Sequence, residues 1–142
     1  MRKVYEKKTL TYEMAACLVE AAIRRANELG VRQCVAVVDE GGNLKAFGRM
    51  DDAPLLGIEA CQRKAYTALF GVGTLELATS IKDEAAVLVG ISHLARATVL
   101  GGGLPLIVEG EMVGGIGVAG GSVEQDVDCA TAAIAVMRDA AD

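Results

Sequence analysis

The glycine-rich segment GGIGVAGGSVEQD, residues 114–126, is the stretch whose residue types and spacing most directly suggest chemistry. Gly115, Gly117 and Gly120 satisfy the G-x-G-x-x-G spacing of dinucleotide-binding loops. Such a loop also needs a helix, a further strand and an acidic residue about 20 positions on. The chain after Gly120 has room for one helix, and no G-K-S/T follows the glycines. We therefore expect neither an NAD site nor another nucleotide site.

Glycines inside a strand also have a steric use. A backbone without side chains lets a helix, a ligand or another subunit approach closely. We predict that Gly114, Gly115 and Gly117 form such a bare patch. The free N–H groups at the start of the following helix can bind a carboxylate or another anion. The segment therefore predicts a small-molecule site that does not hold a dinucleotide.

Arg49, Met50 and Asp51 lie where a predicted strand meets a helix, and we include all three in the candidate ligand site. Arg49 either closes this turn with an ion pair or binds a carboxylate or propionate group of a ligand. Met50 either packs in the core or ligates iron. Lys64 lies in the middle of a predicted helix, and its ammonium group is either solvated or directed to a ligand.

His93 is the only histidine, so a zinc site with several histidines from one chain is excluded. It is a candidate acid–base group, and a structural role is the alternative. Glu124 and Gln125 fall in the first turn of the last helix. They either stabilise that turn or, with Asp126, offer oxygen atoms to a ligand or metal near the glycines.

The composition bounds the class of protein. The 142 residues suffice for one domain with one core, and apolar residues make up 52% but aromatic ones 4%. The net charge of −5 and the scattered basic residues argue against a nucleic-acid partner. No apolar run reaches the ~20 residues that span a bilayer, and the first residues lack a signal peptide's apolar core. We expect a cytoplasmic, single-domain protein over residues 1–142, with no membrane partner.

Two further compositional features concern association and thiols. The mean hydropathy of +0.36 is high for a soluble chain and predicts a homo-oligomer, a dimer or larger. The 4 cysteines are far apart and form no C-x-x-C motif, so we expect buried free thiols rather than a zinc site or a disulfide scaffold.

Capping signals and apolar periodicity predict the helices that must hold these residues. One helix is expected from the cap Thr11 to Gly30, and another from Asp51 or Asp52 to Gly71. A short helix starts at Thr74, and a last one follows the Ser122–Gln125 capping-box pair. Ser80 and Asp83 resemble a capping box for the run 85–96, whose β-branched residues leave helix and strand both open.

The strand signals predict two antiparallel hairpins. Apolar runs and alternating patterns interrupted by turn residues give strands at 34–39 and 44–50, and at 104–108 and 112–121. Residues 97–100 are an additional candidate strand.

Three blocks occur in one order along the chain: VVDEGGNLKAFGRMDDAP, QRKAYTALFG and GGGLPLIVEGEMVGGIGVAGGSVEQD. From about residue 10 to 138 the chain resembles the GlcG/HbpS family, which includes the C-terminal domain of PduO-type proteins. The resemblance implies an α+β, PAS- or profilin-like domain with an antiparallel sheet of about five strands and helices packed on it. It also implies oligomers, haem binding in some relatives, and links to glycolate, diol and cobalamin metabolism. With haem as a possible ligand, His93 is our first candidate for the iron ligand. Asp52 replaces the glycine of the family's R-M-D-G-A pattern.

Two functional hypotheses remain. The favoured one is an oligomeric protein that binds haem, another tetrapyrrole or a carboxylated ligand, with an accessory role in catabolic or cofactor metabolism. Its pocket would lie against residues 114–121 and partly on a neighbouring subunit. The alternative is a small enzyme acting on an organic acid or aldehyde, with His93 as acid or base and Arg49 or Lys64 holding the carboxylate. A purely architectural role is a third alternative.

Overall fold

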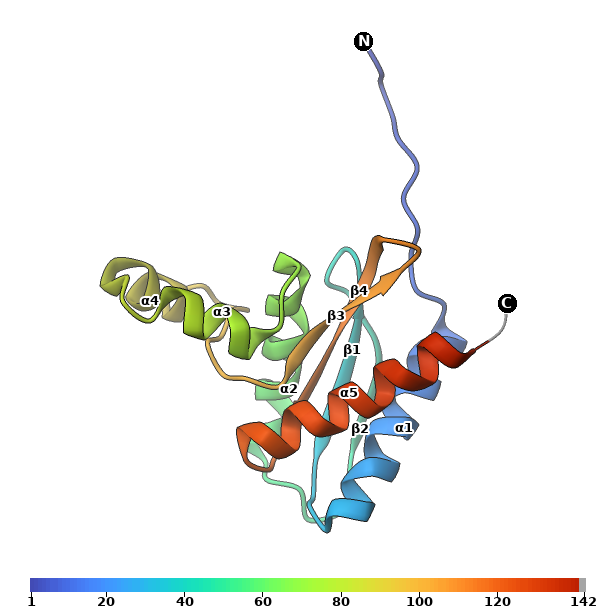
Figure 1. Ribbon diagram of the computed structural model, residues 1–142, viewed down its shortest axis with the longest axis vertical. Helices are drawn as coiled ribbons and strands as arrows, with labels where there is room; N and C mark the ends of the chain where they lie inside the picture. The colour runs from blue at the N-terminus through green and yellow to red at the C-terminus, as the bar shows by residue number, and fades with distance from the viewer. Residues whose placement is uncertain (141–142) are drawn as a thin grey trace.

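A four-stranded antiparallel sheet forms the centre of the structure, a computed structural model that describes residues 1–140 (Figure 1). Its order is β2-β1-β4-β3. The strands are β1 (Cys34–Asp39), β2 (Leu44–Arg49), β3 (Gly103–Val108) and β4 (Glu111–Ala119). Both predicted hairpins, β1–β2 and β3–β4, are confirmed, and β1 pairs with β4 to join them.

The expectation of about five strands is wrong by one, because residues 97–100 do not pair with the sheet. Side-chain hydroxyl groups accept hydrogen bonds from the backbone N–H groups of this segment. The amide of Thr98 donates to the Thr67 hydroxyl at 3.0 Å, and the amide of Leu100 donates to the Thr98 hydroxyl at 3.2 Å. These local bonds replace the ladder of a fifth strand.

Helices α1 (Tyr12–Leu29) and α5 (Val123–Asp139) pack together on one face of the sheet, and α2 (Leu56–Thr67) covers the other (Figure 1). The predicted caps of α1 are present: the Thr11 hydroxyl accepts from the Met14 amide, and Gly30 ends the helix at φ 70°. The capping box at the start of α5 is also confirmed. None of the helices within residues 1–140 has the length and apolarity needed to cross a membrane.

The face beneath α2 is built from small residues. Antiparallel pairing places Ala36 beside Gly117 and Val38 beside Gly115. A Cβ atom on Gly117 would lie 2.0 Å from the Cys61 carbonyl oxygen, and one on Gly115 would lie 2.3 Å from that of Ala65. Gly115 and Gly117 therefore permit a close approach, as predicted, and the segment that approaches is α2. Within one chain no room remains for a ligand against these two glycines. A Cβ atom on Gly114, the third glycine of the predicted patch, would instead lie 2.2 Å from the Val38 carbonyl oxygen of β1.

The chain leaves the sheet after α2 to form an arm, which Figure 1 shows projecting from the body. A short 3₁₀ helix, η1 (Ala68–Phe70), precedes α3 (Thr74–Ile81) and α4 (Ala85–Ser92), which make up the arm. Residues 85–92 are thus helical. The predicted capping box is wrong, because the Ser80 hydroxyl donates to the Leu77 carbonyl at 2.7 Å and no side chain caps α4.

The start of α2 also differs from the prediction. Neither Asp51 nor Asp52 caps it, since the helix begins at Leu56 after Leu55. The two aspartates form an exposed turn in which the Ala53 amide donates to the Met50 carbonyl at 3.0 Å. Asp52 has a φ of 63°, a conformation that glycine adopts freely and that aspartate tolerates. Asp52 thus occupies this turn in a backbone conformation that a glycine would also adopt.

Candidate functional site

An apolar groove with a volume of about 570 Å³ lies between the arm and the C-terminal part of α2. We call it the arm groove. Glu40, Tyr66 and Thr67 are its polar side chains. Its walls include the apolar side chains Leu69, Phe70, Leu77, Val87, Ile91 and Leu94.

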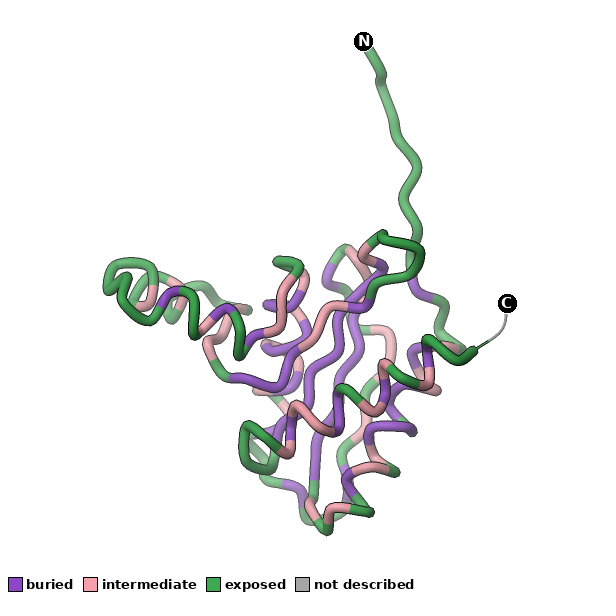
Figure 2. The backbone as a smooth tube through the Cα atoms, viewed as in Figure 1, coloured by how far each residue is buried: buried purple, intermediate pink, exposed green. Residues whose placement is uncertain are grey.

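The arm is unusual in its exposure. Helix α4 has the sequence AAVLVGIS, yet none of its residues is buried. Phe70 and Leu94, both lining the groove, are 76% and 59% exposed. Figure 2 shows mostly exposed backbone along the arm, in contrast to the buried sheet. Exposed apolar surface of this kind marks a site for a ligand or another protein.

Tyr66 and Arg96 stack at one edge of the arm groove. The guanidinium of Arg96 lies 4.0 Å from the centre of the Tyr66 ring, within the range of a cation–π interaction. Its Nη2 also donates to the Gly42 carbonyl in the β1–β2 turn. A second, smaller hollow of about 270 Å³ has Arg96 and Arg63 among its lining residues. Arg63 Nη2 donates to Glu59 Oε1 at 2.7 Å, so its charge is already paired, whereas Arg96 forms no ion pair within residues 1–140.

Glu40 brings an unsatisfied carboxylate to the same edge. Its Oε2 is buried and accepts no hydrogen bond from any residue in 1–140. A buried oxygen without a partner costs free energy unless something else supplies a donor or a cation. The arm groove therefore combines apolar walls, a phenol, a free carboxylate oxygen and nearby guanidinium groups.

His93 is exposed at the C-terminal end of α4 and does not line the arm groove. Val87 and Ile91 face the groove, and His93, two residues beyond Ile91, falls on roughly the opposite side of the helix. Its Nδ1 lies 2.9 Å from the Val89 carbonyl oxygen. Nδ1 donates in this contact, which leaves Nε2 as the free ligand atom, outside the groove.

The Arg49–Asp51 turn lies at the end of β2 farther from the β1–β2 turn, and so away from the arm groove. Arg49 donates to the Ala53 carbonyl from Nε at 3.3 Å and from Nη2 at 3.1 Å. Arg49 therefore closes the turn, as the first of its two predicted roles required. Its partner is a backbone carbonyl, so the predicted ion pair is not formed. Met50 is buried, and its sulfur accepts from the Gln33 amide at 3.3 Å, so it has the core role.

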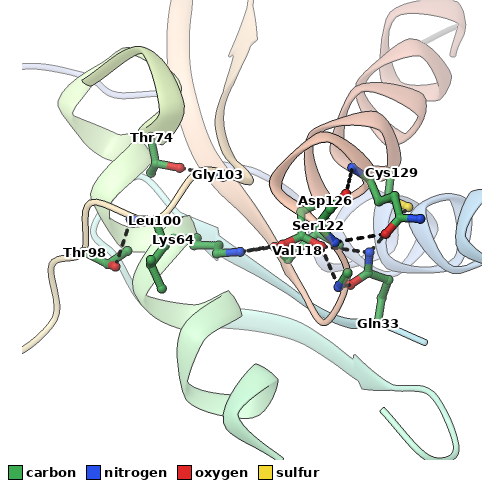
Figure 3. Close-up of polar contacts among 12 residues, drawn as sticks. Gln33, Lys64, Thr74, Thr98, Leu100, Gly103, Val118, Ser122, Asp126 and Cys129 are labelled. Carbon is green, nitrogen blue, oxygen red and sulfur yellow. Dashed lines mark hydrogen bonds and ion pairs between the residues drawn. The ribbon is translucent and has the colours of Figure 1, made fainter. Parts of the chain in front are cut away.

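Lys64 is buried. Its ammonium group is neither solvated nor directed to a ligand site, which were the two predicted roles. Its Nζ donates to Asp126 Oδ2 at 2.7 Å and to the Val118 carbonyl at 2.8 Å (Figure 3). Asp126 Oδ1 accepts from Gln33 Nε2 at 2.9 Å and from the Gly121 amide at 3.0 Å. This polar cluster joins α2 to the start of α5 past the end of β4, so the carboxylate is already occupied.

Glu124 is exposed, and Gln125 serves the helix cap. The Ser122 amide donates to Gln125 Oε1 at 2.9 Å, and the Gln125 amide donates to the Ser122 hydroxyl at 3.2 Å. No three of the described His, Cys, Asp and Glu side chains gather in a group that could hold a metal ion. The first turn of α5 therefore has a structural role in this chain.

The cysteines are free thiols, and Cys34, Cys61 and Cys129 are buried while Cys17 is half-buried. Burial raises the pKa of Cys61 to about 12 and that of Cys129 to about 11. Thiols held in this protonated form are poor nucleophiles and poor ligands.

The arm groove includes residues that we did not single out from the sequence. Tyr66 lies in the QRKAYTALFG block, and Arg96 is a lone cation within the apolar stretch SHLARATVL. An isolated arginine in such a stretch was the available signal. The position of Glu40 depends on how the β1–β2 turn meets the arm, which no local pattern reveals.

Comparisons with known proteins match this architecture. The family model described as "Haem degrading protein HbpS-like" matches residues 10–135. The corrinoid adenosyltransferase PduO of Citrobacter freundii is 38% identical over 132 residues, which cover 92% of this chain and 39% of PduO. The chain thus spans well under half the length of that relative.

Two solved structures are also similar. Klebsiella pneumoniae protein ORFY superposes with a TM-score of 0.92 at 30% identity, covering 99% of both chains. A structure described as a PduOC:heme complex has a TM-score of 0.83 at 39% identity, covering 89% of this chain and 94% of that one. On the family-model match over residues 10–135 and the fold shared with these structures, this chain belongs to the HbpS-like family.

Proposed function

We propose that this protein binds haem, or a closely related tetrapyrrole carrying carboxylates, in the arm groove. The observation that carries the proposal is a groove of about 570 Å³ with mostly apolar walls on a chain whose relative PduOC has been solved with haem. Pockets for small planar ligands have volumes of this order and few polar groups.

The residues in and beside the arm groove fit a tetrapyrrole that carries carboxylates. The macrocycle is apolar and flat, so it gains from contact with Phe70, Leu94 and the apolar face of α4. Its carboxylates need cations, and Arg96 is the guanidinium group beside the groove that no carboxylate of residues 1–140 already pairs. Bound haem supplies an iron centre and a conjugated ring; the chain supplies the apolar cover and the charges that orient it.

A homo-oligomer is part of this proposal. One chain leaves the arm widely exposed, and a second copy that covers it would complete the pocket. The free Nε2 of His93 lies outside the groove of its own chain, so the pocket of one chain does not use His93 as an iron ligand. The free thiols fit a reducing cytoplasm. We assign an accessory role in catabolic or cofactor metabolism.

The test is a hemin titration of purified protein followed in the Soret region. Val87 lines the groove and Val89, on the same helix, does not, so Val87→Asp and Val89→Asp form a matched pair. We expect saturable binding that Val87→Asp weakens at least tenfold and that Val89→Asp changes less than twofold. Absence of saturable binding by the unmodified protein, or equal effects of the two variants, would refute the proposal.

The carboxylate contacts are tested separately with hemin dimethyl ester, whose carboxylates are blocked. We expect it to bind more weakly than hemin, and Arg96→Gln to weaken the binding of hemin more than the binding of the ester. An ester that binds as tightly as hemin would remove Arg96 from the proposal.

A further inference from the structure

We propose that Tyr66 is the residue that ligates the iron of haem bound in the arm groove, with Arg96 balancing the charge of its phenolate. This inference rests on the proposed function and names the iron ligand within that site. It differs from the expectation for His93, whose free nitrogen lies outside the groove.

The residues that line the arm groove leave few candidates for the iron ligand. No histidine, cysteine or methionine of the described residues lines the arm groove, which leaves oxygen donors. The Thr67 hydroxyl is already used: it donates to the Arg63 carbonyl at 2.8 Å and accepts from the Thr98 amide at 3.0 Å. Two donors remain, the Tyr66 phenol and the Glu40 carboxylate.

The Tyr66 ring is fixed while its hydroxyl is free. A Cβ atom on Gly42 would lie 2.9 Å from the ring carbon Cδ2, so the β1–β2 turn packs directly against the ring edge. Arg96 covers a ring face, and its bond to the Gly42 carbonyl holds the guanidinium in place. Among residues 1–140, none makes a hydrogen bond with the Tyr66 hydroxyl, whereas the Thr67 hydroxyl and the Arg96 guanidinium at this edge are both hydrogen-bonded. A rigid ring with a free phenol oxygen is preorganised for a ligand.

Tyrosine is an established type of haem ligand, and it binds as the phenolate. On coordination the phenol O–H bond breaks, the Fe(III)–O bond forms, and the proton passes to water at the open side of the groove. The oxidation state of iron does not change. The guanidinium of Arg96 beside the ring offsets the negative charge that the phenolate brings. Glu40 is the competing donor, and its unpartnered Oε2 makes it the comparison that the experiment must include.

The experiment compares the ferric hemin complexes of the unmodified protein, Tyr66→Phe, Glu40→Gln and His93→Ala by absorption, resonance Raman and electron paramagnetic resonance spectroscopy. Tyr12→Phe is the matched control, because Tyr12 is 67% exposed on α1 and does not line the arm groove. Circular dichroism and thermal unfolding of each variant establish that it folds.

We expect a phenolate-to-iron charge-transfer band and a phenolate Raman mode in the unmodified protein. Both should vanish in Tyr66→Phe and persist in the other variants, with hemin affinity lowered at least tenfold in Tyr66→Phe alone. Saturable hemin binding with an unaltered spectrum in Tyr66→Phe would refute the Tyr66 assignment and leave the proposed function standing. A spectrum lost in Glu40→Gln or His93→Ala but kept in Tyr66→Phe would transfer the role to that residue. No saturable binding by the unmodified protein would overturn both proposals.

Discussion

Gly117 is the position where the packing of α2 on the sheet can be tested most directly. Substituting alanine adds one methyl group, and that atom would lie 2.0 Å from the Cys61 carbonyl oxygen and 2.6 Å from the Ala65 amide nitrogen. Both neighbours are helix backbone, which cannot rotate away as a side chain would. The whole of α2 must therefore move off β4, or the strand must bend.

The expected cost follows from this geometry. Overpacking a core by one or more methyl groups costs about 1–3 kcal/mol, and the rigid neighbours place Gly117→Ala near 3 kcal/mol. For a domain of this size such a loss lowers Tm by roughly 10 °C. Gly90→Ala is the matched control. Gly90 lies in α4, and a Cβ atom there would meet nothing within 4 Å. Alanine at Gly90 should stabilise the protein by about 0.5–1 kcal/mol, because it favours helix.

The assay is urea denaturation followed by circular dichroism at one fixed protein concentration, since self-association would otherwise shift the midpoint. We expect Gly117→Ala to unfold at lower urea than the unmodified protein and Gly90→Ala at equal or higher urea. A Gly117→Ala variant as stable as the unmodified protein would show that α2 does not rest on the strand backbone, and the fold described for this face would be wrong.

Three other predictions concern buried charge, buried thiols and the Asp52 turn. Lys64→Met should lower the free energy of unfolding by about 3–5 kcal/mol, because it leaves a buried carboxylate unpaired. Arg63→Met removes only an exposed ion pair and should lower it by less than about 1 kcal/mol. Urea denaturation measures both changes. Burial raises the pKa of Cys61 from its ordinary 9.0 to about 12, so the unfolded chain loses this proton first and the free energy of unfolding falls as pH rises above 9. The slope that this thiol adds, up to about 1.4 kcal/mol per pH unit, should be missing in Cys61→Ala when unfolding is measured from pH 8 to 10.5. Asp52 has a φ of 63°, so Asp52→Gly should alter stability by less than about 1 kcal/mol. Asp52→Val should lower Tm, because a β-branched residue is strained in this conformation. Calorimetry measures both.

The local elements were largely predictable because their signals are local. The cap at Thr11, the αL glycine at Gly30 and the capping box at Ser122 act within one turn of helix, and each is present as predicted. The alternation and turn residues likewise specified both hairpins. The predicted strand at residues 97–100 failed because a long-range bond competes with the local pattern, while the caps predicted at Ser80 and at Asp51 or Asp52 lost to other local bonds. Thr98 illustrates the long-range case, because its amide binds the hydroxyl of Thr67 rather than a neighbouring strand.

The candidate site was harder to predict because it depends on contacts between distant segments. Lys64 meets Asp126, 62 residues later, and neither residue type nor helical periodicity shows that an ammonium group can be satisfied inside the core. In the same way, Tyr66 and Arg96 come together only because the chain extends into the arm and returns. The glycines of β4 were correctly predicted to permit close approach, but the partner was a helix of the same chain.

By itself, the sequence determined the hairpins, the helix caps and the need for a tightly packed face along β4, because these follow from residue size, capping and spacing that act over short distances. The family and the α+β class came from the resemblance of three sequence blocks to a known family. The tertiary structure decided which segment fills the space above Gly115 and Gly117, which charges are buried as a pair, and where an apolar groove stays open. The physical reason is that burial and pairing are properties of segments brought together by folding, and the free energy of each depends on neighbours far away in the chain.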